Sequence, residues 1–371
     1  MQKDWMSLGL MSGTSGDGVD ASVIKSNGID RYESIKDKYF EYDADIFKDI
    51  HNIKDKIHSI DHLKKFKKEL ENLERKLTIF HAKVVKQLKI SEETIIGFHG
   101  QTIYHNPKEK ISKQLGNAKL LNQLINKDIV YNFRNNDILN GGQGAPLAPV
   151  FHHLMAVQNK INLPVCFLNI GGISNITIIK NSNDLDKLES KDIGPGNCLI
   201  DNWVRKNSNK KFDVDGKLAL SGTRNEIIYE QAQELYMNQN KKKLTFDTND
   251  FDISFIRGLN LEDGTATLTD FTASIIGEEL SLSLVKSNEL IQDILICGGG
   301  RKNKILIKKI KNNSSSKFKF RSIDDFNIDG DFVESRAFAF LAIRSIMGLP
   351  ISFPNTTGCK KASTGGELVK N

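Results

Sequence analysis

The spacing of apolar residues predicts that strands and helices alternate along this chain. Between residues 61 and 89, apolar side chains recur every three or four positions with charges between them, which predicts an amphipathic helix. Short apolar runs at 94–98 and 129–133 predict two strands, each ending in a polar turn. Residues 331–342 predict a buried helix. The chain after Pro354 is rich in Gly, Thr and Lys, so we expect a loop with a loosely ordered end.

A glycine-rich turn follows the apolar strand that begins at Leu8. Its glycines let the backbone come close to a ligand, and backbone N–H groups of such a turn can cradle a phosphate chain. Its two carboxylates, Asp17 and Asp20, can hold a divalent cation through the waters of that cation. The alternative is a plain tight turn without a ligand. The candidate phosphate-binding residues are Gly13, Thr14, Ser15, Gly16, Asp17, Gly18, Val19 and Asp20.

Two further glycine turns strengthen the ligand interpretation. Residues 167–180 repeat the strand–turn–strand pattern of residues 8–25, which predicts two related lobes. Residues 294–303 read as a strand, a glycine turn and the start of a helix, where N–H groups and the helix dipole favour an anion. Walker and Rossmann glycine motifs do not occur here, which disfavours those two folds. The candidates are Gly171, Gly172 and Ser174 in the second turn, and Gly298, Gly299, Gly300 and Asn303 in the third.

Length and charge limit the remaining classes. A chain of 371 residues suits two domains, and the glycine-rich stretch 141–146 is the candidate hinge. The net charge of +6 comes mainly from lysines on solvated helix faces, so we predict no nucleic-acid partner. The four cysteines lie far apart, without metal spacing, and Cys166 and Cys297 read as buried thiols. Apolar runs of about eighteen residues do not occur, so we expect a cytoplasmic protein without membrane contact.

Together these motifs resemble the anhydro-N-acetylmuramic acid kinase family, within the superfamily of sugar kinases, Hsp70 and actin. The resemblance extends nearly from end to end. It implies an α/β protein with a two-lobe ribonuclease H-like actin/sugar kinase fold and an ATP cleft between the lobes. We expect residues 1–143 plus 345–371 in the N-terminal lobe and residues 144–344 in the C-terminal lobe. The motifs that carry it are 9–21, 97–105, 132–149, 168–177, 192–201, 213–222, 266–273, 297–303 and 333–342.

The resemblance implies a kinase of peptidoglycan recycling that uses ATP and Mg²⁺. It would open 1,6-anhydro-N-acetylmuramate with water and place the phosphoryl group on O6. Asp192 is the implied catalytic base, although such a residue alone could be a turn or helix-capping aspartate. Asp17 or Asp20 would face Mg²⁺, and a homodimer is implied by the resemblance alone. The implied sugar-binding residues are His99, Gln101, Arg134, Gln143 and Glu334.

Several alternatives stay open at the level of sequence. His99 could be a structural histidine, and Glu334 could serve only the dipole of its helix. The enzyme could phosphorylate another sugar or anhydrosugar, or the chain could be a nucleotide-dependent switch without sugar chemistry. Four residues depart from the family pattern and leave the substrate less certain than the fold. They are Gly16, Phe98, Asn132 and Ile193.

Overall fold

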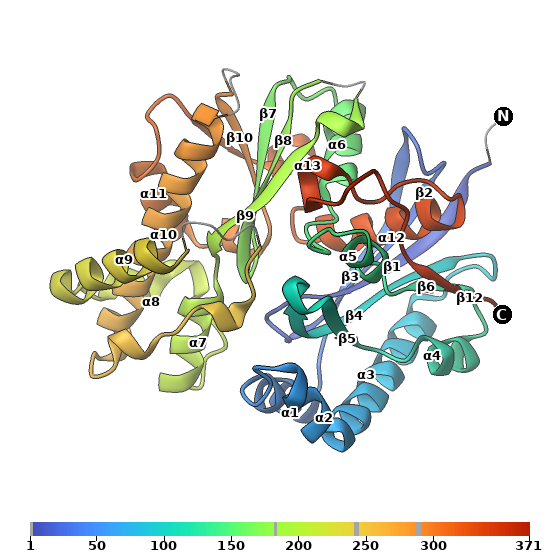
Figure 1. Cartoon of the computed structure of the whole chain (residues 1–371), viewed down its shortest axis with the longest axis horizontal. Helices are drawn as coiled ribbons and strands as arrows, with labels where there is room; N and C mark the ends of the chain where they lie inside the picture. Colours follow the sequence, from blue (N-terminus) through green and yellow to red (C-terminus); the bar gives the residue numbers. More distant parts are fainter. Residues whose placement is uncertain (1–2, 182–183, 241–244, 287–290) are drawn as a thin grey trace. The chain divides into compact units, whose positions relative to one another are not determined.

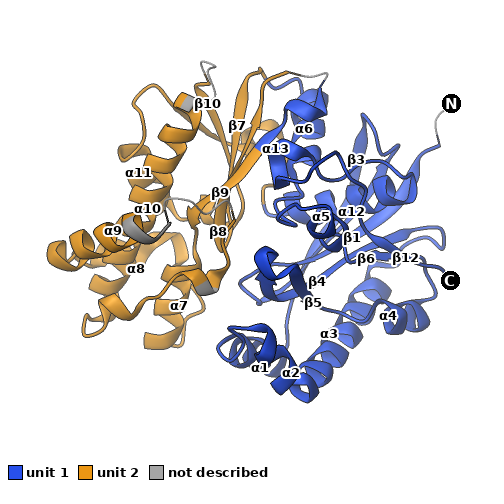
Figure 2. Cartoon of the chain, viewed as in Figure 1, with its two compact units in different colours: residues 1–161, 182–189, 331–371 blue, residues 162–181, 190–330 orange. Residues whose placement is uncertain are grey.

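The chain forms two compact units, each built around one β-sheet with helices packed on it (Figure 1). The computed structural model describes residues 3–181, 184–240, 245–286 and 291–371. Figure 2 shows the two units in different colours. Unit 1 is Met1–Ile161, Ser182–Glu189 and Asp331–Asn371, and unit 2 is Asn162–Asn181 and Ser190–Gly330.

The sheet of unit 1 combines an antiparallel hairpin with parallel strands. β1 pairs antiparallel with β2, and β2 with β3, whereas β4 runs parallel to β1 on its other side. β6 continues parallel to β4, and the order is β12-β6-β4-β1-β2-β3, with β5 paired to β4. The strands are β1 (Trp5–Ser12), β2 (Gly18–Ser26), β3 (Tyr32–Glu41), β4 (Ile95–Asn106), β5 (Ile111–Leu115), β6 (Ile129–Tyr131) and β12 (Glu367–Val369).

Helices cover both faces of this sheet. α12 (Val333–Ile346) crosses one face closely, because a Cβ on Gly9 or Gly97 would overlap the helix backbone. Side chains alternate along a strand, so Leu8 and Ile96 point to the opposite face, where they share a core with α1 and α3. The other helices of unit 1 are α1 (Ala44–Lys54), α2 (Ile60–Lys65), α3 (Lys67–Leu88), η1 (Pro107–Glu109), α4 (Ala118–Ile125), α5 (Asn135–Leu139), α6 (Pro149–Gln158), η2 (Leu185–Lys187) and α13 (Pro354–Thr357).

The sheet of unit 2 repeats the same plan. β7 and β8 form an antiparallel hairpin, and β10 and β11 continue in parallel on the other side of β7. The order β11-β10-β7-β8-β9 therefore places the first hairpin strand in the centre, as β1 is placed in unit 1. The strands are β7 (Val165–Ile170), β8 (Ile173–Ile179), β9 (Glu189–Pro195), β10 (Asp293–Cys297) and β11 (Lys319–Ser322).

A long helix, α10 (Leu261–Lys286), anchors the core of unit 2. Its Phe271 and Ile275 belong to one buried cluster with Leu168 and Ile176 of the β7–β8 hairpin. The remaining helices of unit 2 are α7 (Cys198–Asn207), η3 (Val214–Gly216), α8 (Lys217–Ser221), α9 (Glu226–Asn240), η4 (Thr248–Asp250), η5 (Ser254–Ile256), η6 (Gly299–Lys302), α11 (Lys304–Asn312) and η7 (Ile323–Phe326).

The predicted elements are present, with four differences. The strand predicted over 129–133 ends at Tyr131, because Asn132 has a left-handed φ of +54°. The helix predicted over 61–89 divides into α2 and α3 at Phe66, whose ψ of 21° is not helical. The strand predicted over 94–98 runs on through His99 to Asn106, with a bulge in its pairing to β1. The prediction of a loosely ordered C-terminal end was wrong, because residues 367–369 form an edge strand that pairs with β6. Three residues carry too little apolar pattern to reveal such a strand.

The repeated sheet order confirms the expected two-lobed α/β fold. The first boundary between the units follows Ile161, whereas we expected it after Gln143, and the second precedes Asp331 rather than residue 345. The reason is that α6 and the whole of α12 pack within unit 1. Cys166 and Cys297 are buried thiols, as predicted. No helix among the described residues has the length and apolar character to span a membrane.

Candidate active site

The first glycine-rich turn closes the hairpin between β1 and β2. The Gly16 N–H donates to the Gly13 carbonyl oxygen at 3.2 Å, which defines a four-residue β-turn. Gly16 has a φ of +64°, a left-handed conformation that favours glycine. A Cβ at this position would lie 2.8 Å from Cγ2 of Ile50, which is fully buried in α1. The glycine that departs from the family pattern is therefore the point where α1 packs on the turn.

Gln101 supports this turn from β4. Its side chain is fully buried, and its Nε2 donates to the Gly13 carbonyl oxygen at 2.9 Å. Among the described residues, no group donates to its Oε1. We predicted Gln101 as a sugar ligand, and that role stays a prediction. The structure gives it a contact with the first glycine turn that the sequence did not indicate.

A buried polar chain lies directly before the turn. Ser12 Oγ lies 2.7 Å from the Tyr42 hydroxyl and 3.3 Å from Nε2 of His81, and all three side chains are buried. His81 Nδ1 lies 2.7 Å from the Leu77 carbonyl, so this nitrogen carries the proton and Nε2 accepts. Burial lowers the pKa of His81 to about 4, which keeps the ring neutral at pH 7. This chain fixes the end of β1, and our sequence reading missed it because His81 sits in an ordinary helical pattern.

The two candidate metal carboxylates differ in their surroundings. Asp17 Oδ1 accepts a hydrogen bond from Ser15 Oγ at 2.6 Å within the turn, and the Asp17 carbonyl accepts from the Tyr42 N–H. Asp20 lies farther along β2, opposite Met11 and Tyr39. In the described part of the chain, no group of three or more His, Cys, Asp or Glu side chains forms a metal site. Carboxylate oxygens are among the ligands that Mg²⁺ takes, so the chemistry of either side chain fits the predicted ion.

His99 and Arg134, two of the predicted sugar-binding residues, are joined by hydrogen bonds. His99 Nδ1 lies 2.7 Å from the Gly100 carbonyl, so its Nε2 accepts from Arg134 Nη2 at 2.9 Å. Arg134 Nη1 donates to the Gly144 carbonyl at 2.7 Å. Burial and the Arg134 guanidinium hold the pKa of His99 well below its ordinary value. A neutral His99 therefore orients Arg134, and its role as a sugar ligand stays a prediction.

The remaining sugar candidates lie in different local settings. The Gln143 N–H donates to the Thr357 carbonyl at 2.7 Å, and the neighbouring Gly144 N–H donates to Asp137 Oδ2 at 2.6 Å. These bonds fix the chain that supplies the Gly144 carbonyl to Arg134. Glu334 is half-buried in the first turn of α12, the position where an acidic residue favours the helix dipole.

In unit 2, the second glycine turn and the Asp192 segment pack together through backbone groups. The Gly196 N–H donates to the Gly172 carbonyl at 2.9 Å, and the Asn197 N–H donates to the Gly171 carbonyl at 2.8 Å. A Cβ on Gly196 would overlap the Gly171 carbonyl. The buried Ser174 donates from Oγ to the Pro195 carbonyl at 3.2 Å. The predicted phosphate residues of this turn thus lie against the end of β9, which carries Asp192.

Asp192 lies on β9 and is 8% exposed. Its Oδ2 accepts a hydrogen bond from the Phe246 backbone N–H at 2.9 Å. The neighbouring Ile193 is 1% exposed and belongs to the core cluster of unit 2. The Phe246 N–H and the burial of the side chain restrict the position of the carboxylate. The contact from Phe246 was not predicted, because it joins segments 54 residues apart.

The third turn begins where β10 ends. Gly298 has a φ of +80°, and its N–H donates to the Gly330 carbonyl at 3.3 Å. Arg301 makes a two-pronged contact with Asp324, at 2.7 and 3.0 Å, which lowers the pKa of that carboxyl. Gly299 is exposed, whereas Gly300 is buried. Asn303 caps α11, its Oδ1 accepting from the Leu306 N–H at 3.0 Å, so this predicted ligand already has a structural task.

The other departures from the family pattern have local explanations. Phe98 is 1% exposed, with its ring 4.9 Å from His81, and a Cβ on Gly116 would lie 2.5 Å from the Phe98 ring. Asn132 donates to Glu367 in the terminal strand, while His99 and Gly144 orient Arg134. Val19, a predicted ATP ligand, has its side chain in the core of unit 1, so only its backbone could contact a ligand.

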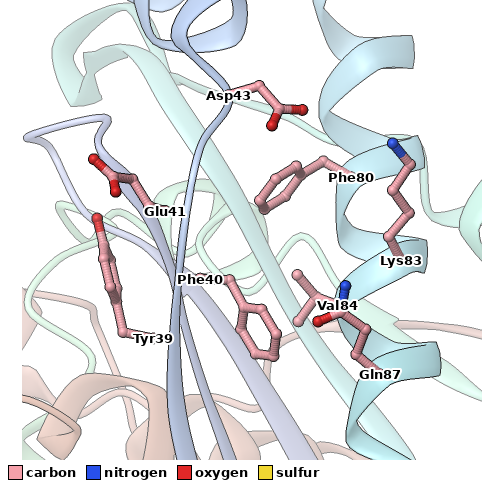
Figure 3. A pocket seen from close by; sticks show the side chains of 8 residues that line it. All are labelled: Tyr39, Phe40, Glu41, Asp43, Phe80, Lys83, Val84 and Gln87. Carbon is pink, nitrogen blue, oxygen red and sulfur yellow. The ribbon is translucent and has the colours of Figure 1, made fainter.

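A pocket of about 450 Å³ lies elsewhere in unit 1, between β3 and α3 (Figure 3). Phe40, Phe80 and Val84 point toward one another there, and Tyr39 and Glu41 lie on the other side of the strand. None of its lining residues is a predicted site residue. The pocket therefore adds nothing to the candidate active site.

Comparison with known proteins connects these features to one family. The family model for anhydro-N-acetylmuramic acid kinase matches residues 5–371. An anhydro-N-acetylmuramic acid kinase from Pelagibacter ubique (strain HTCC1062) is 53% identical, covering 100% of both chains. One from Agrobacterium fabrum (strain C58 / ATCC 33970) is 33% identical over 98% of both.

Solved structures are more distant. The activator of 2-hydroxyisocaproyl-CoA dehydratase from Clostridium difficile with bound ADPNP is 10% identical, with a TM-score of 0.43, covering 92% of this chain and 96% of that one. Hexokinase from Schistosoma mansoni with glucose is 10% identical, with a TM-score of 0.41, covering 91% and 85%. The sequence matches over the full length suffice: the chain belongs to the anhydro-N-acetylmuramic acid kinase family.

Proposed function

We propose that this kinase converts 1,6-anhydro-N-acetylmuramate, ATP and water into N-acetylmuramate 6-phosphate and ADP, as a step of peptidoglycan recycling in the cytoplasm. Membership of the family over the whole chain supports the substrate. The observation that carries the chemistry is the carboxylate of Asp192, which is 8% exposed and held by the Phe246 N–H beside a glycine turn.

In this proposal Asp192 acts as the general base. The O6 atom of the substrate is bound in the bridge to C1, so water must first attack C1. Asp192 takes a proton from that water while the new C1–O bond forms and the C1–O6 bond breaks. O6 then bonds to the γ-phosphorus, and the bond to the bridging oxygen of ADP breaks. Attack opposite the bridge inverts C1, as in inverting glycosidases.

The glycine turns would bind the nucleotide. Backbone N–H groups around Thr14 and Gly172 would contact the phosphates, and the turn at Gly298–Gly300 would hold the adenosine. Asp17 or Asp20 would hold Mg²⁺ through its carboxylate oxygens. The ion would neutralise the charge of the phosphates during transfer.

On the sugar side, Arg134 would bind the lactyl carboxylate. Its planar guanidinium can make two parallel hydrogen bonds to a carboxylate, and His99 and Gly144 already fix its plane. Gln143 and Glu334 remain candidates for the sugar hydroxyl and amide groups. A homodimer remains part of the proposal on family grounds, and sedimentation of the purified chain tests it.

The test is ADP release with three sugars: 1,6-anhydro-N-acetylmuramate, N-acetylmuramate and levoglucosan. We expect turnover with the first and at most about 1% of it with the others, because only the first offers both the bridge and the lactyl carboxylate. In water enriched with ¹⁸O, the label should enter at C1 of the product and not in the phosphate. Activity with N-acetylmuramate alone would favour an ordinary sugar kinase. ATP hydrolysis unaffected by all three sugars would favour a switch ATPase.

A further inference from the structure

The direction of one peptide plane decides what the first glycine turn can bind. In the β-turn Gly13–Gly16, the central peptide joins Thr14 and Ser15. The central peptide of such a turn can take two opposite orientations, which distinguish turn types I and II. Type II needs a positive φ at the third residue, and Ser15 has none, so this turn does not take the type II orientation. A peptide is planar, with its C=O and N–H on opposite sides. Whatever fixes the Thr14 carbonyl therefore also fixes the direction of the Ser15 N–H.

Lys54 stabilises that carbonyl in its observed orientation. It is the last residue of α1, and its Nζ donates to the Thr14 carbonyl oxygen at 2.6 Å. Such a charge-assisted hydrogen bond is stronger than one between neutral groups. The Ser15 N–H must consequently point away from the ammonium of Lys54.

The same helix is seated on the turn by an apolar contact. Ile50 lies one helical turn before Lys54, on the same face of α1. It is fully buried and occupies the space beside Gly16 that a side chain on residue 16 would need. The Tyr42 N–H, just before α1, donates to the Asp17 carbonyl at 2.9 Å, which ties the other end of the turn. Lys54 therefore reaches Thr14 from a fixed support.

We propose that Lys54 is a positioning residue for nucleotide phosphates. It holds the central peptide of the turn so that the Ser15 N–H faces the phosphate chain, and it adds a positive charge beside a turn that is followed directly by the carboxylate of Asp17. This inference rests on the proposed function, because it takes the turn to bind ATP.

The experiment measures nucleotide binding by calorimetry on the full chain, with ATP and with adenosine as separate probes. For Lys54→Met we expect the Kd for ATP to rise about tenfold, the effect of losing about 1.4 kcal/mol. The Kd for adenosine should stay within about twofold, because adenosine has no phosphate to meet the turn. Lys54→Arg should restore most of the ATP affinity. Lys48→Met, on an exposed position of the same helix, is the matched control and should bind ATP like the wild type.

The outcomes separate the inference from the proposed function. Unchanged ATP affinity in Lys54→Met, or an equal loss for ATP and adenosine, overturns the role of Lys54 while turnover on the anhydrosugar stands. If Lys54→Met does not fold, Lys54→Gln replaces it and should show a weaker loss for ATP alone, because its amide keeps a donor without the charge. If the wild type binds adenosine but not ATP, both the inference and the proposed kinase function are wrong.

Discussion

The two units share one sheet plan, yet they hold their glycine turns by different means. In unit 1, side chains from distant segments hold the turn at Gly13–Gly16: Gln101 bonds the Gly13 carbonyl, and Lys54 bonds the Thr14 carbonyl. In unit 2, mainly backbone groups hold the turn at Gly171–Gly172: the N–H groups of Gly196 and Asn197 bond its carbonyls, and one side-chain bond, from Asn197 Nδ2 to the Gly171 carbonyl at 3.2 Å, adds to them. Side-chain substitutions should therefore alter the first turn more than the second, whereas a change of backbone shape should alter the second most.

The units also differ in their titrating groups. All eight histidines of the sequence lie between residues 51 and 153, within unit 1. Burial lowers the pKa of His81 to about 4 and that of His152 to about 3. Unit 2 has no histidine, so its stability has no such source of pH dependence in the same range.

The largest expected effect concerns acid stability. An unfolded histidine titrates near pH 6.5, so between that pH and about 4 the unfolded chain binds more protons than the folded one. The contribution of the buried, neutral histidines to the stability of unit 1 is therefore complete above pH 6.5 and declines as the pH falls. Each buried histidine costs up to about 1.4 kcal/mol per pH unit in that window. We expect the urea midpoint of unit 1 to fall between pH 7 and pH 5, with a much smaller fall in unit 2.

The sequence provides a reporter for each unit. It has two tryptophans, Trp5 in unit 1 and Trp203 in unit 2. Trp203→Phe leaves a fluorescence signal from unit 1, and Trp5→Phe leaves one from unit 2. His81→Gln should reduce the pH dependence of the unit 1 signal. Equal falls for both signals, unchanged by His81→Gln, would contradict the difference between the units.

The next effect tests the backbone contacts of unit 2. In Gly196→Ala, the new Cβ overlaps the Gly171 carbonyl, so the turn and the end of β9 must separate. We expect turnover to fall about 100-fold, because displacement of a catalytic group by about 1 Å costs that much. Gly258→Ala is the control: its φ of +93° strains an alanine, but a Cβ there meets no atom within 4 Å. Wild-type turnover in Gly196→Ala would show that these backbone contacts do not position Asp192.

The smallest expected effects come from removing one side-chain hydrogen bond at each of the two glycine turns. Gln101→Leu removes a buried hydrogen bond to the Gly13 carbonyl, and a bond of this kind contributes about 1 kcal/mol, so KM for ATP should rise about fivefold. Ser174→Ala removes the bond to the Pro195 carbonyl, but the backbone bonds of that turn remain, so KM should change less than about twofold. The same steady-state assay measures both. A larger change in Ser174→Ala than in Gln101→Leu would reverse the comparison.

The features that could be predicted from the sequence are those that depend on local patterns of residues. Strand–glycine–strand spacing predicted both hairpins, and the apolar period predicted α3 and α12. The motifs also identified the family, which the full-length match confirms. The terminal strand β12 was missed, because three residues at a sheet edge carry almost no periodic signal.

The hydrogen bonds that hold the candidate site residues in place could not be predicted in the same way. Lys54 reads as one of many lysines on a solvated helix face, and only the fold places it on Thr14, 40 residues earlier. The contact between Phe246 and Asp192 likewise depends on tertiary packing. His99 shows the reverse case: its motif predicted a place in the site, but only its hydrogen bonds indicate that it orients Arg134.

The central claim is that Asp192 is the base of an anhydrosugar kinase, and Asp192→Asn tests it most directly. The amide keeps the size of the side chain but cannot take the proton from water. ADP formation with 1,6-anhydro-N-acetylmuramate should fall at least about 100-fold. The Kd for ATP, measured on the same preparation, should stay within about threefold of the wild type. Turnover within about tenfold of the wild type would contradict the role of Asp192 and the mechanism built on it.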